Sequence, residues 1–268
     1  MHFECGTWVT MSKGEARCNL LRKLKKWWLG PAECFHRLSP ELGEFFDSLR
    51  DGTSLDLDSR KGKAPGGYQL QRDHSRKPFI FMNATGLQRD LETMVHEAGH
   101  AFHSIYADHL PLVDYRSAPI EFCEVAAMSM ELLTHDFLDE FYSPEDANRA
   151  VREHLEGIVS ILAWIATIDA FQHWIYTNPG HTKEERHQQW IELGERFGSI
   201  LDWSEFEEWR KVGWQRQLHL FFVPILLHRI RNCSIGCTAT LASIPKEPAN
   251  STRQLCEIDA IRWLTAIA

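Results

Sequence analysis

The chain has 268 residues, of which 44% are hydrophobic, and carries a formal net charge of −8 at pH 7. This length and composition can bury a substantial core, as one large or two ordinary domains, while the acidic balance argues against a nucleic-acid partner. We identify no apolar run of membrane-spanning length and no signal-peptide pattern, and therefore expect a cytoplasmic protein without a membrane partner.

The first predicted elements are a helix and a pair of strands. A helix over residues 38–49 is indicated by its Ser-Pro-Glu start, which is typical of a cap with proline in the first turn. Short apolar runs at residues 66–70 and 79–83 then predict two strands, and the polar residues 71–78 connect them. We expect a β-hairpin directly before the next helix.

Residues 87–106 form the most strongly patterned segment of the chain. Gly99 in its middle costs about 1 kcal/mol relative to alanine in a helix, which suggests that another part of the chain approaches the backbone there. The apolar residues recur at helical spacing and predict an amphipathic helix: Leu91, Met94, Val95, Ala98, Ala101 and Phe102.

Within this helix, residues 96–100 read His-Glu-Ala-Gly-His. Two histidines four positions apart project from one helix face and can bind the same metal ion. Zinc suits such a site, because a third protein ligand and an open position for water complete its coordination. Glu97 between the histidines supplies a base, so the pattern is typical of a metallopeptidase. The alternative is a chance occurrence of a five-residue pattern.

A second helix is predicted over residues 119–141, and it carries three acids among apolar residues. These acids are Glu121, Glu124 and Glu131. A buried carboxylate without a partner is costly, and a metal ion is one possible partner. Exposure to solvent, or pairing with arginine, is the other explanation.

The remaining pattern is helical. A Ser-Pro-Glu-Asp start at 143–146 leads into a long helix that ends at Asn178-Pro179-Gly180. Further helices are predicted over residues 183–198, 204–212 and 214–222. The sequence therefore predicts a mainly α fold without internal repeats.

Several motifs together resemble one enzyme family. HEAGHAFH at 96–103, followed by APIEFCEVAAMSME at 118–131, resembles the oligoendopeptidase F branch of the thimet oligopeptidase family. The resemblance covers residues 36–224 and implies a mainly α, zincin-like helical catalytic domain with a small β-hairpin beside the HExxH helix. It also implies a zinc-dependent metalloendopeptidase that hydrolyses oligopeptides. Four further motifs look like that branch, in its order: RKGKAPGGY at 60–68, PFIFMN at 78–83, IDAFQHWIY at 168–176 and WQRQLHLF at 214–221.

The resemblance implies which residues bind the metal. One Zn²⁺ per chain would be held by His96, His100 and Glu124, where the family has its two histidines and its acid. Glu121 and Glu131 remain competing candidates for the third ligand. They rank second because the family's acid is followed by small residues and by a further Glu seven positions later, a pattern that Glu124 and Glu131 fit.

The resemblance also implies the role of the acid inside the motif. Glu97 would be the general base that takes a proton from a zinc-activated water and passes it to the leaving amine. His103 and Glu131 would hold the ligands in place. Alternatively, both are polar residues whose hydrogen bonds serve only the fold.

Substrate contacts are implied at two places. The strand 78–83 resembles the family's edge strand, to which a peptide substrate adds backbone hydrogen bonds, so Phe81, Met82 and Asn83 are predicted to bind substrate. The alternative is a plain core hairpin. His219 is predicted to be catalytic, because it stands where the family's histidine helps to hold the substrate carbonyl.

The two ends of the chain depart from the family. After His219 the family continues through a tyrosine-rich segment, whereas no tyrosine follows residue 224 here. Codons can be chosen for residues 225–240 that, read one nucleotide out of register, encode such a segment. Shifted codons for residues 16–35 likewise give acidic text that resembles the family. We therefore predict frame displacements near Phe35 and Pro224. They divide the chain into a non-family leader (1–35), a metallopeptidase core (36–224) and a non-family tail (225–268).

Two other functions remain open on the sequence. One is a catalytically impaired zinc-binding fragment, since the family's tyrosines stabilise the oxyanion. The other is a zinc peptidase of another HExxH family, such as an aminopeptidase. An aminopeptidase needs an acidic pocket for a free amine, and we find no separate motif for one. The sequence predicts no oligomeric state.

Overall fold

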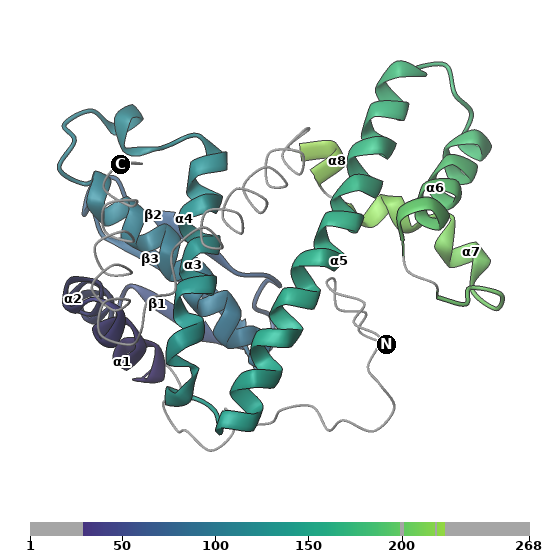
Figure 1. Ribbon diagram of the computed structural model, residues 1–268. Helices are drawn as coiled ribbons and strands as arrows, with labels where there is room; N and C mark the ends of the chain where they lie inside the picture. The colour runs from purple at the N-terminus through teal and green to yellow at the C-terminus, as the bar shows by residue number, and fades with distance from the viewer. Residues whose placement is uncertain (1–28, 199–200, 218, 223–268) are drawn as a thin grey trace, which may run out of the picture. The chain divides into compact units, whose positions relative to one another are not determined.

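The computed structural model describes residues 29–198, 201–217 and 219–222 (Figure 1). The predicted tail and most of the predicted leader lie outside these residues. The chain divides into two compact units, and each is described by itself. The sheet unit contains the described residues up to Val151, and the helical unit contains those from Arg152 onward.

A three-stranded sheet in the order β1-β3-β2 lies in the sheet unit. The predicted hairpin is confirmed, because β2 (Tyr68–Gln71) pairs antiparallel with β3 (Pro78–Ala84). The expectation that 78–83 is an edge strand is wrong. β1 (Leu55–Asp58) pairs parallel with the other side of β3, so β3 is the central strand and β2 is an edge.

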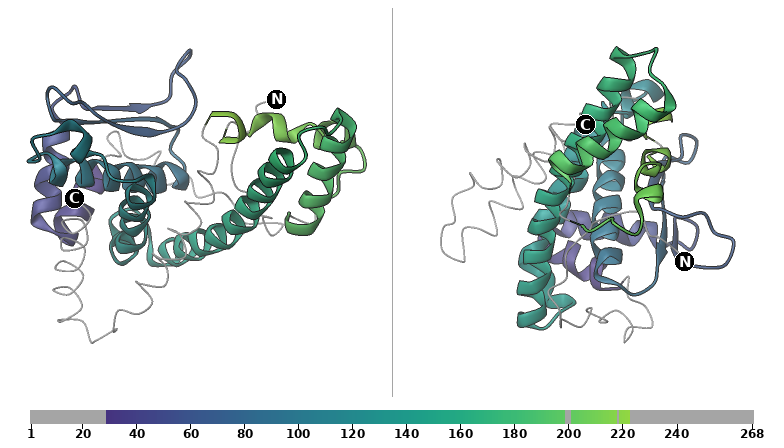
Figure 2. Two further views of the ribbon diagram at one scale, coloured as in Figure 1. Left: turned by 90° about the horizontal axis from the view of Figure 1, so that it is seen from above. Right: turned by 90° about the vertical axis from the view of Figure 1, so that its right-hand side faces the viewer.

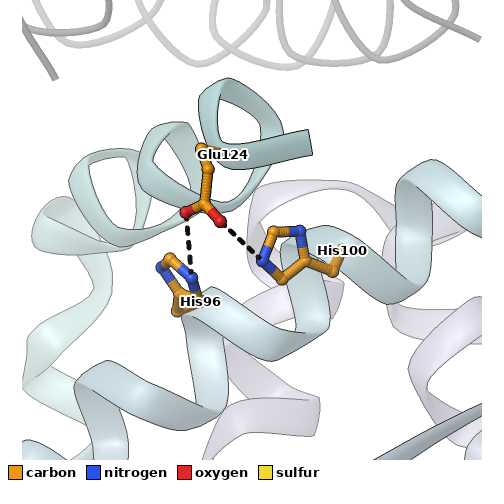
Figure 3. Close-up of side chains that lie close together, drawn as sticks. All are labelled: His96, His100 and Glu124. Carbon is orange, nitrogen blue, oxygen red and sulfur yellow. Dashed lines mark ion pairs between the residues drawn. The ribbon is translucent and has the colours of Figure 1, made fainter. Parts of the chain in front are cut away.

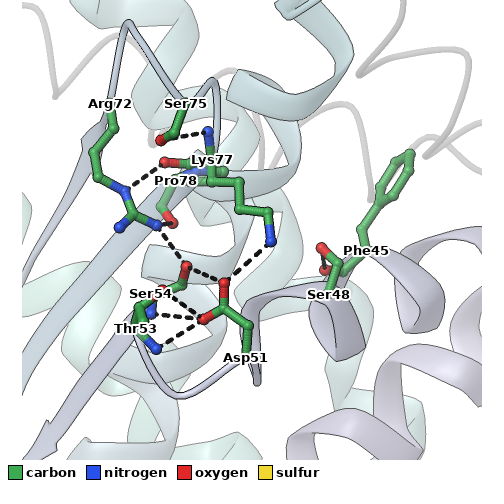
Figure 4. A network of polar contacts seen from close by, with 9 residues as sticks. All are labelled: Phe45, Ser48, Asp51, Thr53, Ser54, Arg72, Ser75, Lys77 and Pro78. Carbon is green, nitrogen blue, oxygen red and sulfur yellow. Dashed lines mark hydrogen bonds and ion pairs between the residues drawn. The ribbon is translucent and has the colours of Figure 1, made fainter.

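Polar contacts fasten the start of β1 to the connection between β2 and β3 (Figure 4). The Asp51 carboxylate accepts hydrogen bonds from the backbone N–H groups of Thr53 (2.8 Å) and Ser54 (3.0 Å). Lys77 reaches the same carboxylate at 3.1 Å, and Arg72 donates to the Ser54 hydroxyl at 2.6 Å. The Thr53 backbone bond, together with Lys77, lowers the pKa of Asp51 below its usual range. These contacts fix the sheet on which the candidate site rests.

Four helices accompany the sheet, and the view from above shows the sheet lying over them (Figure 2). They are α1 (Leu29–Leu38), α2 (Pro40–Leu49), α3 (Gln88–Ala107) and α4 (Ile120–Leu133). The predicted helices 38–49 and 87–106 correspond to α2 and α3. The predicted helix 119–141 corresponds to α4, which ends at Leu133. The chain continues there as a 3-10 helix over Thr134–Glu140.

The helix α1 runs through the predicted leader boundary at residue 35. Phe35 is fully buried, with ring centroids 5.1 Å from Phe46 and 4.9 Å from Phe102. Residues on both sides of the boundary therefore belong to one helix and one core. The frame displacement itself stays a prediction.

The crossing of α3 and α4 depends on Gly99. A Cβ atom at Gly99 would lie 2.6 Å from the Ala127 Cα and 2.9 Å from the Ala126 carbonyl oxygen. Real side chains do not approach a backbone so closely, so only glycine permits this crossing. The expectation of a close backbone neighbour at Gly99 is confirmed.

Replacing Gly99 by alanine is therefore expected to destabilise the protein by about 1–3 kcal/mol, because the two backbones must separate. Gly157, within α5 (Pro144–Thr177), is the matched control, since a Cβ there meets nothing within 4 Å. Alanine at 157 is expected to stabilise by up to about 1 kcal/mol through helix propensity. Urea unfolding followed by circular dichroism measures both variants. Equal effects at 99 and 157 would contradict the packing argument.

The helical unit contains the rest of α5, then α6 (Lys183–Phe197), α7 (Glu207–Arg210) and α8 (His219–Phe222). The predicted long helix and the helix 183–198 are confirmed. Thr182 and Glu185 form a capping box at the start of α6. The predicted helices 204–212 and 214–222 are confirmed only in part, because α7, α8 and a 3-10 helix at Gly213–Arg216 each cover just four residues of them. Trp214 in that turn is buried among aromatic residues, so tertiary packing overrides the helical pattern.

The helix α5 also corrects the expectation about membrane-spanning length. It contains an 18-residue window of mean hydropathy 1.4, which is long and apolar enough to cross a membrane. Length and composition alone are weak evidence for a membrane span, because core helices of other proteins meet the same criteria.

Candidate active site

Three side chains from two helices converge at the α3–α4 crossing (Figure 3). His96 and His100 project from α3, and Glu124 points toward them from α4. Glu124 lies 3.6 Å from the His96 Nε2 and 4.0 Å from the His100 Nε2. One nitrogen or oxygen atom from each residue lies within 4.8 Å of the others.

These separations fit a tetrahedral zinc ion. Zinc binds imidazole nitrogen and carboxylate oxygen at about 2.0–2.2 Å, so neighbouring ligand atoms stand roughly 3.4 Å apart. The separations of 3.6 and 4.0 Å are close to that value and exceed hydrogen-bonding distance. Two imidazoles and one carboxylate form the ligand set of a catalytic zinc site with an open fourth position.

Further contacts orient the two histidines. Glu131 hydrogen-bonds to the Nδ1 of His96 at 2.5 Å, on the opposite side of the ring from Glu124. The His100 ring forms a hydrogen bond with the backbone of Cys123. The Nδ1 of His96 is therefore held by the protein while its Nε2 faces Glu124, as is general for metal-binding histidines. The structure places Glu131 behind His96, not in the position of a third ligand.

Two other predicted polar residues lie near the site in the sequence. His103 is buried on α3, and its charge acts on His100. The Glu121 side chain lies outside the described part of the structure. Of the three candidate acids, Glu124 is thus the one that the described geometry brings to both histidines.

Burial and charge set the protonation of the ligand histidines. Burial alone lowers the pKa of His96, but the hydrogen bond with Glu131 and the charges of the nearby carboxylates raise it to about 9. Burial, with the charges of His96 and His103, lowers the pKa of His100 to about 3. Burial also raises the pKa of Glu124. A histidine must be unprotonated to bind a metal ion, a condition that the lowered pKa of His100 meets and the raised pKa of His96 does not.

Glu97 is the other functional group of the motif. Its side chain is buried at 6% exposure, and burial raises its pKa to about 7. The charge of His96 and a hydrogen bond from the backbone N–H of Gln69 act in the opposite direction. A carboxylate with a pKa near neutrality can accept and return a proton at physiological pH.

The edge strand β2 lies against this carboxylate. A Cβ atom at Gly67, directly before β2, would lie 3.6 Å from the Glu97 Oε1. Since the Gln69 backbone N–H donates to Glu97, the outer edge of β2 faces this carboxylate. The sequence predicted a strand near the motif but named the wrong strand as the edge.

The predicted substrate residues on β3 serve partly structural roles. Met82 is buried at 1% exposure. The Phe81 ring stacks on Tyr68 of β2, with centroids 4.9 Å apart. The Asn83 amide donates hydrogen bonds to the carbonyl oxygens of Ala64 and Gly66. Their role in substrate binding stays a prediction.

His219 lies at the start of α8 in the helical unit. Its side chain lies outside the described part of the structure. The described geometry therefore brings together His96, Glu97, His100 and Glu124, while the role of His219 remains a prediction.

Curated relatives agree with the resemblance seen in the sequence. Oligopeptidase PepF of Bacillus subtilis (strain 168) is 26% identical over 186 residues, which are 65% of this chain and 28% of PepF. The chromosomal oligoendopeptidase F of Lactococcus lactis subsp. cremoris is 35% identical over 88 residues, which are 32% of this chain and 14% of that protein. The chain thus spans less than a third of the length of these curated relatives.

Solved structures show the same relationship. An X-ray structure assigned as oligoendopeptidase F matches with a TM-score of 0.77 and 30% identity over 89% of this chain and 41% of that one. A structure of PZ peptidase A with an inhibitor matches with a TM-score of 0.75 and 30% identity over 88% of this chain and 44% of that one. The mainly helical fold is confirmed by these matches. The family model for peptidase family M3 covers residues 44–222, so the chain belongs to that family.

Proposed function

We propose that the protein is a zinc-dependent metalloendopeptidase that hydrolyses peptide bonds in oligopeptides. One Zn²⁺ per chain is held by His96, His100 and Glu124. The observation that carries the proposal is the convergence of these three ligands within 4.8 Å, next to a buried carboxylate with a pKa of about 7. The names of the relatives, oligopeptidase and oligoendopeptidase, support the substrate class.

The chain's own residues supply the proton transfers. Bound zinc contributes Lewis acidity, which makes water a better nucleophile at neutral pH. Glu97 accepts the proton of the water that attacks the peptide carbonyl, and then delivers it to the leaving nitrogen. Its raised pKa suits both steps, since the same group must be a base and then an acid. The buried position of Glu97 restricts competing water at the carboxylate.

The substrate backbone is proposed to bind along the outer edge of β2. Among the described strands, β2 pairs with β3 on one side, and its other edge faces Glu97. An extended peptide can add to such an edge through main-chain hydrogen bonds. β3 is paired with a strand on each side, so its backbone cannot pair with a substrate peptide. Phe81, Met82 and Asn83 can therefore affect the substrate only through their side chains or through β2.

Replacing Glu131 by glutamine is expected to weaken zinc binding about 10- to 100-fold, because the amide holds His96 less firmly than a carboxylate does. Zinc affinity measured by competition with a chromophoric chelator tests this. The matched control is Glu92→Gln. Glu92 also lies on a helix, α3, and its carboxylate accepts a hydrogen bond from Gln88 at 3.0 Å. An unchanged affinity in the Glu131 variant would mean that the contact with His96 serves only the fold.

Hydrolysis of internally quenched peptides tests the function itself. We expect cleavage at internal peptide bonds. A zinc chelator should abolish this cleavage, and added zinc should restore it. N-terminal aminoacyl substrates should not be cleaved. Preferential release of N-terminal residues would instead support an aminopeptidase of another HExxH family.

One feature of the sequence favours a second candidate, a zinc-binding fragment with impaired catalysis. Tyrosine is absent after residue 224, where the related family has its oxyanion donors, and loss of one such donor costs about 10²–10³ in rate. A variant whose residues from 225 onward are rewritten in the displaced frame is expected to hydrolyse peptides faster than the parent. If the parent already hydrolyses peptides at an ordinary rate of about 1–10³ per second, the predicted frame displacement at the tail does not affect function.

A further inference from the structure

A buried lysine lies on the segment that leads into β2. The Lys63 side chain is 1% exposed. Its ammonium group donates to the backbone carbonyl of Asp56 at 2.9 Å, to the carboxylate of Asp56 at 3.1 Å and to the carbonyl of Asp58 at 3.0 Å. It also lies 4.4 Å from the centre of the Phe81 ring. A lysine is seldom so buried unless it is paired, and this one joins the segment to β1 and β3.

A second side chain holds the same segment farther along. The side-chain amide of Asn83, on β3, donates two hydrogen bonds to this segment. They reach the Ala64 carbonyl at 2.7 Å and the Gly66 carbonyl at 2.9 Å. Gly66 has a φ of +99°, a backbone conformation that favours glycine, and it leads the chain into β2. Lys63 and Asn83 thus hold residues 63–66 against β1 and β3.

The residue that follows this segment, Gly67, lies beside the Glu97 carboxylate. A Cβ at Gly67 would lie 3.0 Å from the Thr93 side chain, 3.4 Å from the Phe81 carbonyl oxygen and 3.6 Å from the Glu97 carboxylate. Two residues later, the Gln69 backbone donates to Glu97. Gln69 is also held by its side chain, which lies 3.1 Å from the Ser104 hydroxyl on α3.

We propose that Lys63 and Asn83 are positioning residues that clamp residues 63–66 and thereby hold the outer edge of β2, which follows directly, against Glu97. This inference rests on the proposed function for its catalytic consequence, since Glu97 is there the base and β2 the substrate edge. Neither residue touches the reacting atoms. Their effect reaches the site through the backbone of Gly67 and Gln69.

The test uses Lys63→Met, Asn83→Ala and Asn83→Asp in the full chain. Asn83→Asp keeps the side-chain shape but removes both donors, so it separates hydrogen bonding from packing. Arg60→Ala is the control for Lys63, because Arg60 pairs with the same Asp56 carboxylate at 2.6 Å but is 59% exposed. Asn178→Ala is the control for Asn83, because the Asn178 amide also donates to a backbone carbonyl, that of Trp174 at 2.9 Å, and lies outside the segment and the site.

Amide hydrogen exchange over residues 60–71 is the readout that does not depend on activity. The three clamp variants are expected to exchange faster there, while the controls match the parent and all variants bind zinc in equal amounts. Peptide hydrolysis is expected to fall about 10- to 100-fold in the clamp variants, mainly through kcat, since small displacements of a base are costly. The controls should keep the parent's kcat.

The outcomes separate this inference from the proposed function. Unchanged exchange over residues 60–71 in the clamp variants, or parent-like behaviour of Asn83→Asp, would overturn the clamp. Equal losses of kcat in the controls would also overturn it. A parent without peptidase activity would contradict the proposed function, and the exchange measurements would still decide whether the clamp exists.

Discussion

Replacing Glu97 by glutamine is expected to abolish measurable peptide hydrolysis while zinc stays bound. The amide keeps the size and shape of the buried side chain but cannot accept a proton. Loss of a general base typically costs about 10²–10⁴ in rate. Single-turnover hydrolysis of a quenched peptide measures the loss, and metal analysis of the same sample shows whether zinc is retained.

The control for this variant is Glu92→Gln, the same substitution five residues earlier on α3. Glu92 accepts a hydrogen bond from Gln88 and is not among the three described side chains that converge as metal-binding candidates. It should hydrolyse peptide as the parent does. If the Glu97 variant cleaved at the parent rate, Glu97 could not be the base.

Replacing Glu124 by glutamine is expected to remove zinc and, with it, peptide hydrolysis. Among the acids whose side chains the structure describes, Glu124 is the one that lies near the Nε2 atoms of both His96 and His100. Its loss should weaken zinc binding beyond the roughly 10- to 100-fold expected for groups that only orient a ligand, such as Glu131. Metal analysis after dialysis measures the zinc content. Full retention of zinc by the Glu124 variant would exclude it as the third ligand.

The helices of the site could be predicted from the sequence because their signals are local. The 3.6-residue period of α3 is visible over twenty residues, and a glycine inside it signals a close neighbour. The HExxH spacing places two histidines on one face for the same reason. These features depend on residues within a few turns of each other.

The choice of the third ligand depends on tertiary structure. Glu121, Glu124 and Glu131 all lie on one predicted helix, and their spacing alone does not say which one meets the histidines. The contact of Gly99 with the backbone of Ala127 sets the position of α4 on α3, and that position brings Glu124 to the site. The pattern of charges could not distinguish these three acids, whereas the resemblance to the family favoured Glu124.

The order of the strands could not be predicted for a similar reason. β1 has only four residues, and its parallel pairing with β3 joins segments separated by the β2 hairpin. The alternating Leu-Asp-Leu-Asp of residues 55–58 is a period-two signal, but it is too short to stand out. Likewise, Lys63 belongs to a charged, glycine-containing segment that is typical of an exposed loop, although the fold buries its ammonium group.

X-ray absorption at the zinc edge tests the central claim most directly, because it identifies the atoms bound to the metal. The account predicts about one zinc per chain, bound by two imidazole nitrogens and by oxygen at about 2.0–2.2 Å, without sulfur. The chain has seven cysteines, so a cysteine-bound zinc is a real alternative. Sulfur ligands at about 2.3 Å, or the absence of stoichiometric zinc, would contradict the site at His96, His100 and Glu124.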